Sequence, residues 1–177
     1  SWSITPSPNY PGENILYGVS GTSANDVWGV GAAWDRVTAK QIFLHWNGSS
    51  WTHVTGPGGP TACVGCTGDV LAMGPDDVWA VGSTIGHWNG TAWILVPNPE
   101  LPGTIGMTLR SLAKIGPCDA WSVGGSFDVE GAESALSAHL TAGGGTINQP
   151  PIAVASPDPS SGPGPLEVHF SSAGSVD

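Results

Sequence analysis

The sequence repeats one seven-residue phrase three times, and this repetition limits the possible folds more than any other feature. The phrase has an aspartate two residues before a tryptophan and ends in Val-Gly. It occupies residues 25–31, 76–82 and 118–124. Trp79 follows Trp28 by 51 residues (79 − 28), and Trp121 follows Trp79 by 42 (121 − 79). Periods in this range are typical of stacked supersecondary units, so each unit must contain several elements.

A second phrase, His-Trp-Asn-Gly-x-x-Trp, travels with the first at residues 45–51 and 87–93. Asn-Gly between such flanks predicts a hairpin with a type I′ turn, in which both central residues have positive φ. An apolar run also precedes each Asp-x-Trp phrase. These runs cover residues 15–20, 69–73 and 109–115. We therefore expect four short antiparallel strands in each unit.

Four strands in about 45 residues is the arithmetic of a β-propeller blade. The chain resembles bacterial tandem-repeat, kelch-like β-propellers that carry Asp-Val-Trp-Ala-Val-Gly and His-Trp-Asn-Gly-x-x-Trp repeats. The resemblance covers residues 1–148 and implies an all-β fold of about three four-stranded blades. It implies little about activity, since propellers of one build serve as enzymes, adhesins and scaffolds.

The repeats divide the propeller region into a short opening segment and three units. Residues 1–8 align with the fourth strand of the second unit, so they are expected to be a lone fourth strand. The units are predicted at residues 9–56, 57–99 and 100–148, the last of them degenerate. Three blades are fewer than the four to eight of a usual ring. Either neighbouring sequence or another copy of the chain is expected to complete the ring or stack.

Residues 149–177 differ in composition, with many prolines, glycines and serines. This segment looks like the opening of a polycystic-kidney-disease-type (PKD) domain, an immunoglobulin-like β-sandwich common in secreted microbial proteins. It would supply two strands and ends before that family's Trp-Asp-Phe-Gly-Asp-Gly signature. A two-stranded pair is marginal in water, so it needs a further strand or a packing partner.

The charge balance limits the partners that the chain can have. Four Lys and Arg stand against fourteen Asp and Glu, for a net charge of −10. Nucleic acid and anionic membrane surfaces both require a basic footprint, so neither is an expected partner. No run approaches the roughly 18 apolar residues of a membrane-spanning helix, so no membrane insertion is expected. The composition favours a secreted or cell-surface location.

The cysteines are sparse. Cys63 and Cys66 form a Cys-x-x-Cys pair, and only Cys118 remains. A zinc site needs more ligands, and a thioredoxin-like site needs a βαβ context. In blade topology the first two lie in a loop between blades and Cys118 on the opposite face, so a Cys63–Cys66 disulfide is expected, with two free thiols as the open alternative. Cys118 is then free or paired with another chain.

Two polar residue types recur at equivalent positions of the three units. They are His45, His87 and His139, and Asp26, Asp77 and Asp119. Because they are dispersed one per blade, they cannot converge on one metal ion. We expect the histidines to pack between blades with a backbone partner and the aspartates to cap turns. No catalytic residue, metal or cofactor is predicted, and no enzymatic activity is expected of this chain alone.

Eight of the nine tryptophans belong to the repeat phrases, which predicts a role in the core between blades. The exception is Trp34, in the expected loop 32–41. Trp34 is the candidate for a ligand contact, and polysaccharide is the ligand considered. Asn47 and Asn89 match the N-glycosylation acceptor pattern at the hairpin tips. The turn alone also explains both asparagines.

Three functions remain open at the level of sequence. In the first, the chain is a non-enzymatic extracellular structural protein whose copies assemble head to tail by strand exchange into a fibre or sheath. In the second, it is a carbohydrate- or protein-binding module of a larger secreted hydrolase or adhesin. In the third, it belongs to a lyase or hydrolase propeller whose active site lies in blades that this chain lacks.

Overall fold

The computed structural model describes residues 1–59, 67–141, 156–158 and 169–171. Every element of regular secondary structure in these residues is a β-strand, which confirms the predicted all-β fold. The chain divides into two compact units, Ser1–Thr141 and Ala142–Asp177, and each is described by itself. The boundary predicted between residues 148 and 149 lies outside the described residues.

The first unit contains two four-stranded sheets and one three-stranded sheet, each a simple antiparallel meander. Sheet 1 comprises β1 (Glu13–Ser23), β2 (Asp26–Trp34), β3 (Ala39–Trp46) and β4 (Trp51–His53). Sheet 2 comprises β5 (Asp69–Gly74), β6 (Asp77–Val81), β7 (Ile85–Trp88) and β8 (Trp93–Val96). Sheet 3 comprises β9 (Thr104–Gly116), β10 (Asp119–Asp128) and β11 (Glu133–Thr141).

The strand register is the same in the three sheets. The repeat tryptophan lies opposite the repeat histidine in each: Trp28 opposite His45, Trp79 opposite His87, and Trp121 opposite His139. The Asp-x-Trp phrase therefore forms the second strand of every sheet and the histidine lies on the third. Positions in one sheet can thus be compared directly with positions in another.

The predicted type I′ turns are wrong. β3 and β4 are joined by a four-residue loop in which Gly48 has φ 95° and Asn47 does not have positive φ. The Asn47 side-chain oxygen accepts hydrogen bonds from the backbone N–H of Ser49 and Ser50, both at 3.0 Å. The asparagine thus closes the loop with its side chain in an Asx-turn, which needs positive φ only at the glycine.

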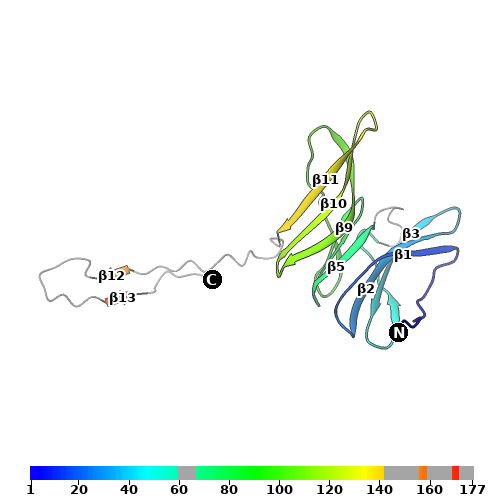
Figure 1. Ribbon diagram of the computed structural model, residues 1–177, viewed down its shortest axis with the longest axis horizontal. Helices are drawn as coiled ribbons and strands as arrows, with labels where there is room; N and C mark the ends of the chain where they lie inside the picture. The colour runs from blue at the N-terminus through cyan, green and yellow to red at the C-terminus, as the bar shows by residue number, and fades with distance from the viewer. Residues whose placement is uncertain (60–66, 142–155, 159–168, 172–177) are drawn as a thin grey trace, which may run out of the picture. The chain divides into compact units, whose positions relative to one another are not determined.

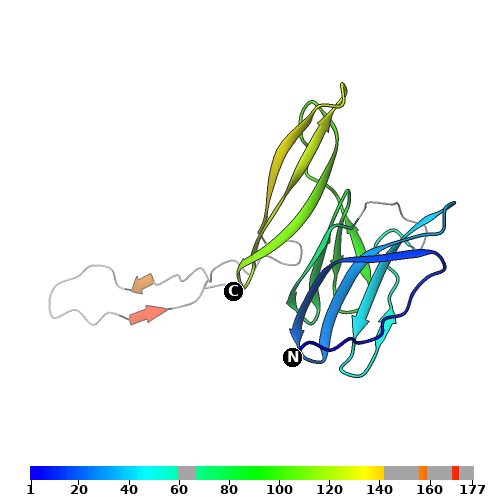
Figure 2. The same ribbon diagram turned by 45° about the vertical axis from the view of Figure 1, so that its right-hand side comes forward.

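The three sheets pack face to face, and their first strands β1, β5 and β9 lie next to one another (Figures 1 and 2). We call the face that carries the repeat tryptophan the trailing face of a sheet, and the opposite face the leading face. Trp28, Val30 and Phe43 belong to the trailing face of sheet 1, and they form one buried cluster with Val78 and Trp93 of sheet 2. The trailing face of one sheet therefore packs on the leading face of the next.

The second junction follows the same rule with smaller side chains. Val81 of the trailing face of sheet 2 packs against Met107 and Leu109 of sheet 3. Leu109 is 1% exposed, and its backbone N–H donates to the Gly82 carbonyl at 2.8 Å. Asp69 of β5 accepts a hydrogen bond from the Leu112 N–H at 2.8 Å. Apolar burial and cross-sheet hydrogen bonds thus hold the three sheets together.

Residues 1–10 form no strand, although residues 1–8 were expected to be a fourth strand. Trp2 and Ile4 are 104% and 98% exposed, since this segment has no strand to pair with in the unit. In the second unit, β12 (Ser156–Asp158) and β13 (His169–Ser171) form a short antiparallel pair. Identification of that unit as a PKD domain stays a prediction.

Candidate functional site

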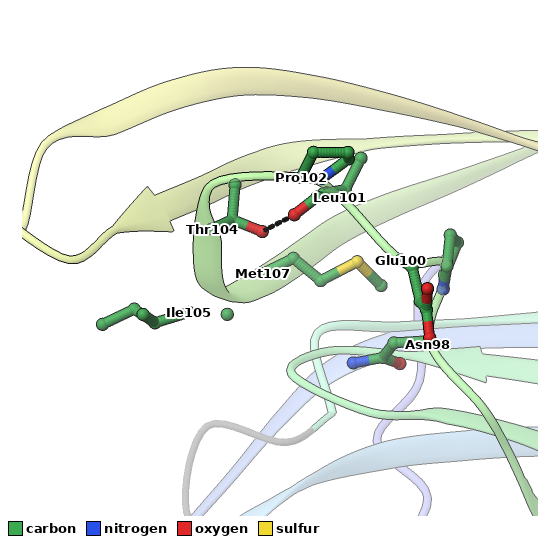
Figure 3. A pocket seen from close by; sticks show the side chains of 9 residues that line it. Asn98, Glu100, Leu101, Pro102, Thr104, Ile105 and Met107 are labelled. Atoms are coloured by element: carbon green, nitrogen blue, oxygen red, sulfur yellow. Dashed lines mark hydrogen bonds between the residues drawn. The ribbon is translucent and has the colours of Figure 1, made fainter.

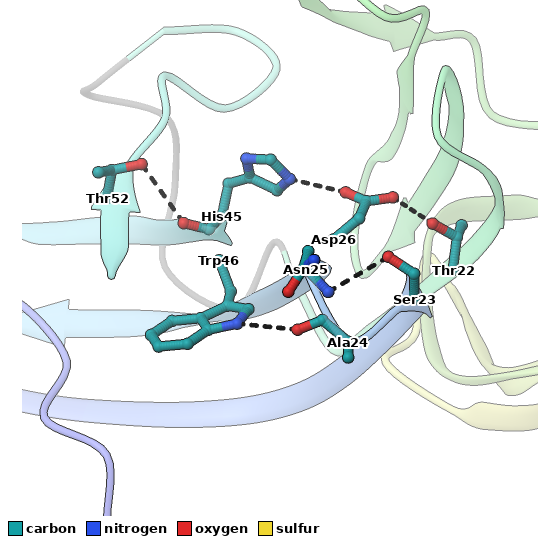
Figure 4. Close-up of polar contacts among 8 residues, drawn as sticks. All are labelled: Thr22, Ser23, Ala24, Asn25, Asp26, His45, Trp46 and Thr52. Carbon is teal, nitrogen blue, oxygen red and sulfur yellow. Dashed lines mark hydrogen bonds and ion pairs between the residues drawn. The ribbon is translucent and has the colours of Figure 1, made fainter. Parts of the chain in front are cut away.

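The repeated polar residues form a cluster in sheet 1. Asp26 starts β2 and His45 lies near the end of β3, and the His45 Nε2 is 2.7 Å from Asp26 Oδ1 (Figure 4). The other carboxylate oxygen of Asp26 accepts a hydrogen bond from the Thr22 hydroxyl. The His45 ring lies 4.5 Å from the Trp28 ring between centroids. Asp26 thus binds His45, and the ring of His45 contacts the repeat tryptophan of the same sheet.

The same three-residue cluster recurs in the other sheets. His87 contacts Asp77 at 2.9 Å, and its ring stacks on Trp79 at 4.2 Å. In sheet 3 the His139–Asp119 distance is 2.7 Å, and the ring of His139 stacks 4.4 Å from that of the repeat tryptophan.

These contacts correct two expectations. In the described residues each of the three aspartate carboxylates binds a histidine side chain and not the backbone N–H of a turn, and the partner of each histidine is a carboxylate and not a backbone group. The sequence contained a signal for this pairing, because the Asp-x-Trp phrase and the His-Trp-Asn-Gly phrase recur together in the first two units. The strand register then brings the aspartate of the first phrase next to the histidine of the second.

A His–Asp pair can serve catalysis only when the second ring nitrogen faces a nucleophile or a substrate. Among the described residues no hydroxyl or thiol is hydrogen-bonded to any of the three rings. Each ring instead lies on tryptophan, which leaves the carboxylate to fix its orientation. Each pair links the second strand of its sheet to the third.

The trailing faces differ sharply in exposure although they are built alike. Trp28 is 1% exposed and Trp79 is 6% exposed, because each is covered by the next sheet. Trp121, at the same position of sheet 3, is 43% exposed. Val123, which lies two residues further along β10, is 54% exposed. The trailing face of sheet 3, defined by its exposed apolar residues Trp121 and Val123, is therefore not covered by another sheet in the described residues.

Sheet 3 is also open at its outer edge. β11 pairs with β10, and within the described ranges it has no partner on its other side. Sheets 1 and 2 each have a fourth strand at this place, β4 and β8. An uncovered edge strand presents unpaired N–H and C=O groups and is a template for pairing with another chain.

Trp34 lies at the end of β2, and the loop expected at residues 32–41 is shorter in the structure. Its backbone pairs with Glu13 and Ala39, and its side chain is 51% exposed. The turn beside it is held by Asp35, whose carboxylate accepts hydrogen bonds from the N–H groups of Thr38 and Val37. These bonds, that of Thr38 first, hold the pKa of Asp35 below its ordinary value.

The two glycosylation candidates lie at exposed loops. Asn47 and Asn89 are exposed, and the side-chain oxygen of each accepts backbone hydrogen bonds within its own loop. The attachment atom of such a site is the side-chain nitrogen, so the loop geometry leaves it accessible. Cys63 and Cys66 lie outside the described residues, and with them the expected disulfide. Cys118 is exposed and free, in the turn between β9 and β10.

Two of the cavities that the described residues line are shallow and open to solvent. One, of about 430 Å³, lies between the loop that precedes β9 and the start of that strand (Figure 3). Its loop is closed by the Thr104 hydroxyl, which donates to the Leu101 carbonyl at 2.8 Å, and Glu100 is its single charged residue. The other, of about 700 Å³, lies beside the β1–β2 turn, where Lys114 Nζ donates to the Met73 carbonyl. Neither gathers free polar groups.

Within the described part of the chain, no three or more His, Cys, Asp or Glu side chains gather in a way that could hold a metal ion. The same residues include no helix that is long and apolar enough to cross a membrane.

Comparison with known proteins adds no family to this description. No protein-family model matches the chain, and no curated protein matches it. The assignment of residues 1–148 to a kelch-like propeller and of residues 149–177 to a PKD domain thus rests on the sequence motifs. The feature that the structure adds is the open face and open edge of sheet 3, which sequence reasoning did not locate.

Proposed function

We propose that the chain is a non-enzymatic structural protein of the cell surface or extracellular space that assembles with copies of itself by strand exchange. In this proposal residues 2–5 of one copy pair with β11 of the next and become the fourth strand of its sheet 3. The observation that carries the proposal is the pairing-competent edge of β11 in a sheet whose two siblings have four strands.

The donor segment is suited to this place by its spacing. In sheet 2 the fourth strand starts at Trp93 and the next sheet starts at Thr104, 11 residues later (104 − 93). Trp2 precedes the start of β1 at Glu13 by the same 11 residues (13 − 2). Trp-Pro spacing is also shared, because Pro6 and Pro97 each follow the tryptophan by four residues.

The internal register predicts which residues pair. His87 lies opposite Ile94 and Gly86 opposite Leu95 in sheet 2. Transfer of this register to sheet 3 places Ser3 opposite His139 and Ile4 opposite Ala138. Trp2 would then occupy in sheet 3 of the acceptor copy the position that Trp93 has in sheet 2. Its side chain would therefore lie between sheets 2 and 3 of that copy.

Charge does not oppose this pairing despite the net charge of −10. Neither residues 2–5 nor residues 134–141 contain Asp, Glu, Lys or Arg. Repulsion between copies therefore acts at longer range, where salt screens it. Assembly of this kind is heterologous, so it propagates as a filament unless the rotation between copies closes a ring.

Disulfide trapping tests the predicted register. A chain with Ile4→Cys and Ala138→Cys, in a Cys118→Ser background, should give a ladder of linked copies on a non-reducing gel. Cross-strand partners have Cβ atoms about 4.5–5.5 Å apart, close to the spacing that a disulfide needs.

The matched control carries Ile4→Cys with Ser134→Cys. Ser134 lies on the same strand four residues away, which is about 13 Å at the usual rise of a strand. Equal linkage in both variants, or monomer in both, would contradict the proposal. A parent chain with only Cys118→Ser measures any background from Cys63 and Cys66.

Polysaccharide binding is the second candidate, and the exposed Trp34 side chain favours it. An aromatic face beside a polar turn is a surface on which a sugar ring can stack. Retention of the chain on insoluble polysaccharide, and its loss in Trp34→Ala, would support this function. Equal elution of both proteins with the void volume would rule it out.

A further inference from the structure

We infer that the trailing face of sheet 3, Trp121 and Val123, is a docking surface for the leading face of sheet 1 of a second copy. The leading face of sheet 1 is defined by Leu16, Val19 and Trp51. This inference rests on the proposed self-assembly and adds to it a face-to-face contact, separate from the strand exchange at the edge of β11.

The junction between sheets 1 and 2 shows what this docking would look like. Trp28 of the trailing face lies edge-on to Trp93 at 5.3 Å between ring centroids, and 4.9 Å from Trp88. Phe43 contacts the same Trp93 ring at 4.8 Å. A trailing tryptophan thus contacts both tryptophans of the following sheet. Such aromatic contacts stabilise an interface beyond the area that they bury.

Both halves of an equivalent junction are present. On the leading face of sheet 1, Trp51 and Tyr10 already cover Ile42 and Leu44, so the surface left for a second copy is the outer side of Trp51 and the exposed residues of β1. Trp121 stands at the position of Trp28, and Trp46 and Trp51 of sheet 1 stand at the positions of Trp88 and Trp93. Trp93 is 7% exposed, whereas Trp46 and Trp51 are both only partly buried.

The first strand shows the same contrast between an open and a covered leading face. Val19 is 69% exposed, and its counterpart in sheet 2, Val70, is 3% exposed. The side chains that would meet at the new junction are therefore of the kinds that already meet inside the chain.

Small residues of β2 let the Trp51 ring lie close to the leading face of sheet 1. Gly29 and Gly31 lie on that face, and the Trp51 ring lies over Gly29, where an added Cβ would stand 3.6 Å from it. Leu16, at 47% exposure, lies opposite Gly31. Trp51 and Leu16 therefore form part of the apolar surface on which a second sheet can pack.

The strand exchange and the face docking are geometrically compatible. Inside the chain, the fourth strand of sheet 2 leads directly into sheet 3, which packs on sheet 2. In the assembly, residues 2–5 would complete sheet 3 of one copy, and the 11-residue connection would bring their own sheet 1 onto the trailing face of that sheet. One head-to-tail joint would thus continue the internal stack.

Sedimentation velocity over a concentration series tests the inference with four chains: the parent, Trp121→Ala, Ser3→Pro and the double variant. In the predicted register Ser3 is a hydrogen-bonded partner of His139, so proline at this position removes a backbone donor of the strand exchange. Residue 3 forms no strand in the described chain and is exposed, so the substitution should leave the fold of the monomer unchanged. Trp121→Ala should lower the association constant at least about tenfold, the size expected of an aromatic hot spot.

Two controls separate docking from general loss of an exposed side chain. Trp34→Ala removes a tryptophan of similar exposure away from both faces and should associate like the parent. Val123→Ser should weaken association, and Val129→Ser, at the exposed turn after β10, should not.

The outcomes distinguish the two proposals. If Ser3→Pro matches the parent while Trp121→Ala associates more weakly, strand exchange is wrong and the face docking stands. If Trp121→Ala and Val123→Ser both match the parent while Ser3→Pro associates more weakly, the face docking is overturned and strand exchange stands. A parent chain that stays monomeric at every concentration overturns both.

Discussion

Sheets 1 and 3 contain the same cluster of residues, yet the environment of that cluster differs. In each, a tryptophan ring contacts a histidine ring, and an aspartate binds that histidine at 2.7 Å. Trp28 is 1% exposed, however, and Trp121 is 43% exposed. The difference shows that the repeat sequence determines geometry within a sheet, while burial depends on the neighbouring sheet. The cluster of sheet 3 is therefore built like that of sheet 1 but has no covering sheet in the described residues.

The largest expected difference concerns the two tryptophans. Trp28→Ala should lower the free energy of unfolding by about 3–5 kcal/mol, since it leaves a cavity in the packed junction of sheets 1 and 2. In dilute, monomeric protein, Trp121→Ala should cost less than about 1 kcal/mol, since its ring is already in contact with water. Urea unfolding of both variants, monitored by circular dichroism, measures the difference. Equal costs would mean that the face of sheet 3 is buried in the monomer.

The coupling energy of the His–Asp pair should also differ between sheets 1 and 3, but by a smaller amount. A double-mutant cycle with Asp26→Asn and His45→Gln should give a coupling of about 1 kcal/mol. The cycle with Asp119→Asn and His139→Gln should give under about 0.5 kcal/mol, because water screens the more exposed pair. Side-chain exposures are 31% and 19% for His45 and Asp26, against 38% and 43% for His139 and Asp119. A stronger coupling in sheet 3 would contradict this ordering.

The smallest expected effect is on the pH dependence of stability, and it arises in β4, the fourth strand of sheet 1. Sheet 3 has no fourth strand in the described residues. Burial lowers the pKa of His53 below 6.5, and its ring lies 4.3 Å from that of Tyr10. The unfolded chain therefore binds a proton more readily than the folded chain does, and stability should fall as pH drops through 6.5 toward the lower folded value.

His53→Gln should flatten this part of the curve. The measurement is the urea midpoint of both proteins at several pH values on either side of 6.5, with Thr52→Ser as the control. An unchanged slope in His53→Gln would show that other groups cause the acid dependence.

Much of the fold could be predicted because the strand pattern is repeated. The three Asp-x-Trp phrases and the preceding apolar runs predicted the first two strands of each sheet in the right order. The turn at Asn47 was mispredicted, since Asn-Gly alone does not distinguish a two-residue turn from a longer loop closed by the asparagine side chain. Residues 1–8 form no strand within the single chain, because a strand exists only when an edge is available to pair with it.

The candidate site was harder to predict than the fold. The contact between Asp26 and His45 depends on the register of β2 against β3, which involves both strands. Each phrase considered alone suggested a turn cap for the aspartate and a backbone partner for the histidine. The exposure of Trp121 could not be predicted from its phrase either, because that phrase is shared with two buried tryptophans. Burial at the end of a stack depends on whether another sheet packs on the last one.

Electron cryo-microscopy of the native, undenatured assembly tests the central claim most directly. The account predicts filaments or rings in which a fourth strand, formed by residues 2–5 of a neighbouring copy, lies beside β11, with Trp121 covered by Trp46 and Trp51 of that neighbour. Discrete single chains with an unpaired β11, or an assembly joined through other surfaces with Trp121 open to solvent, would contradict it.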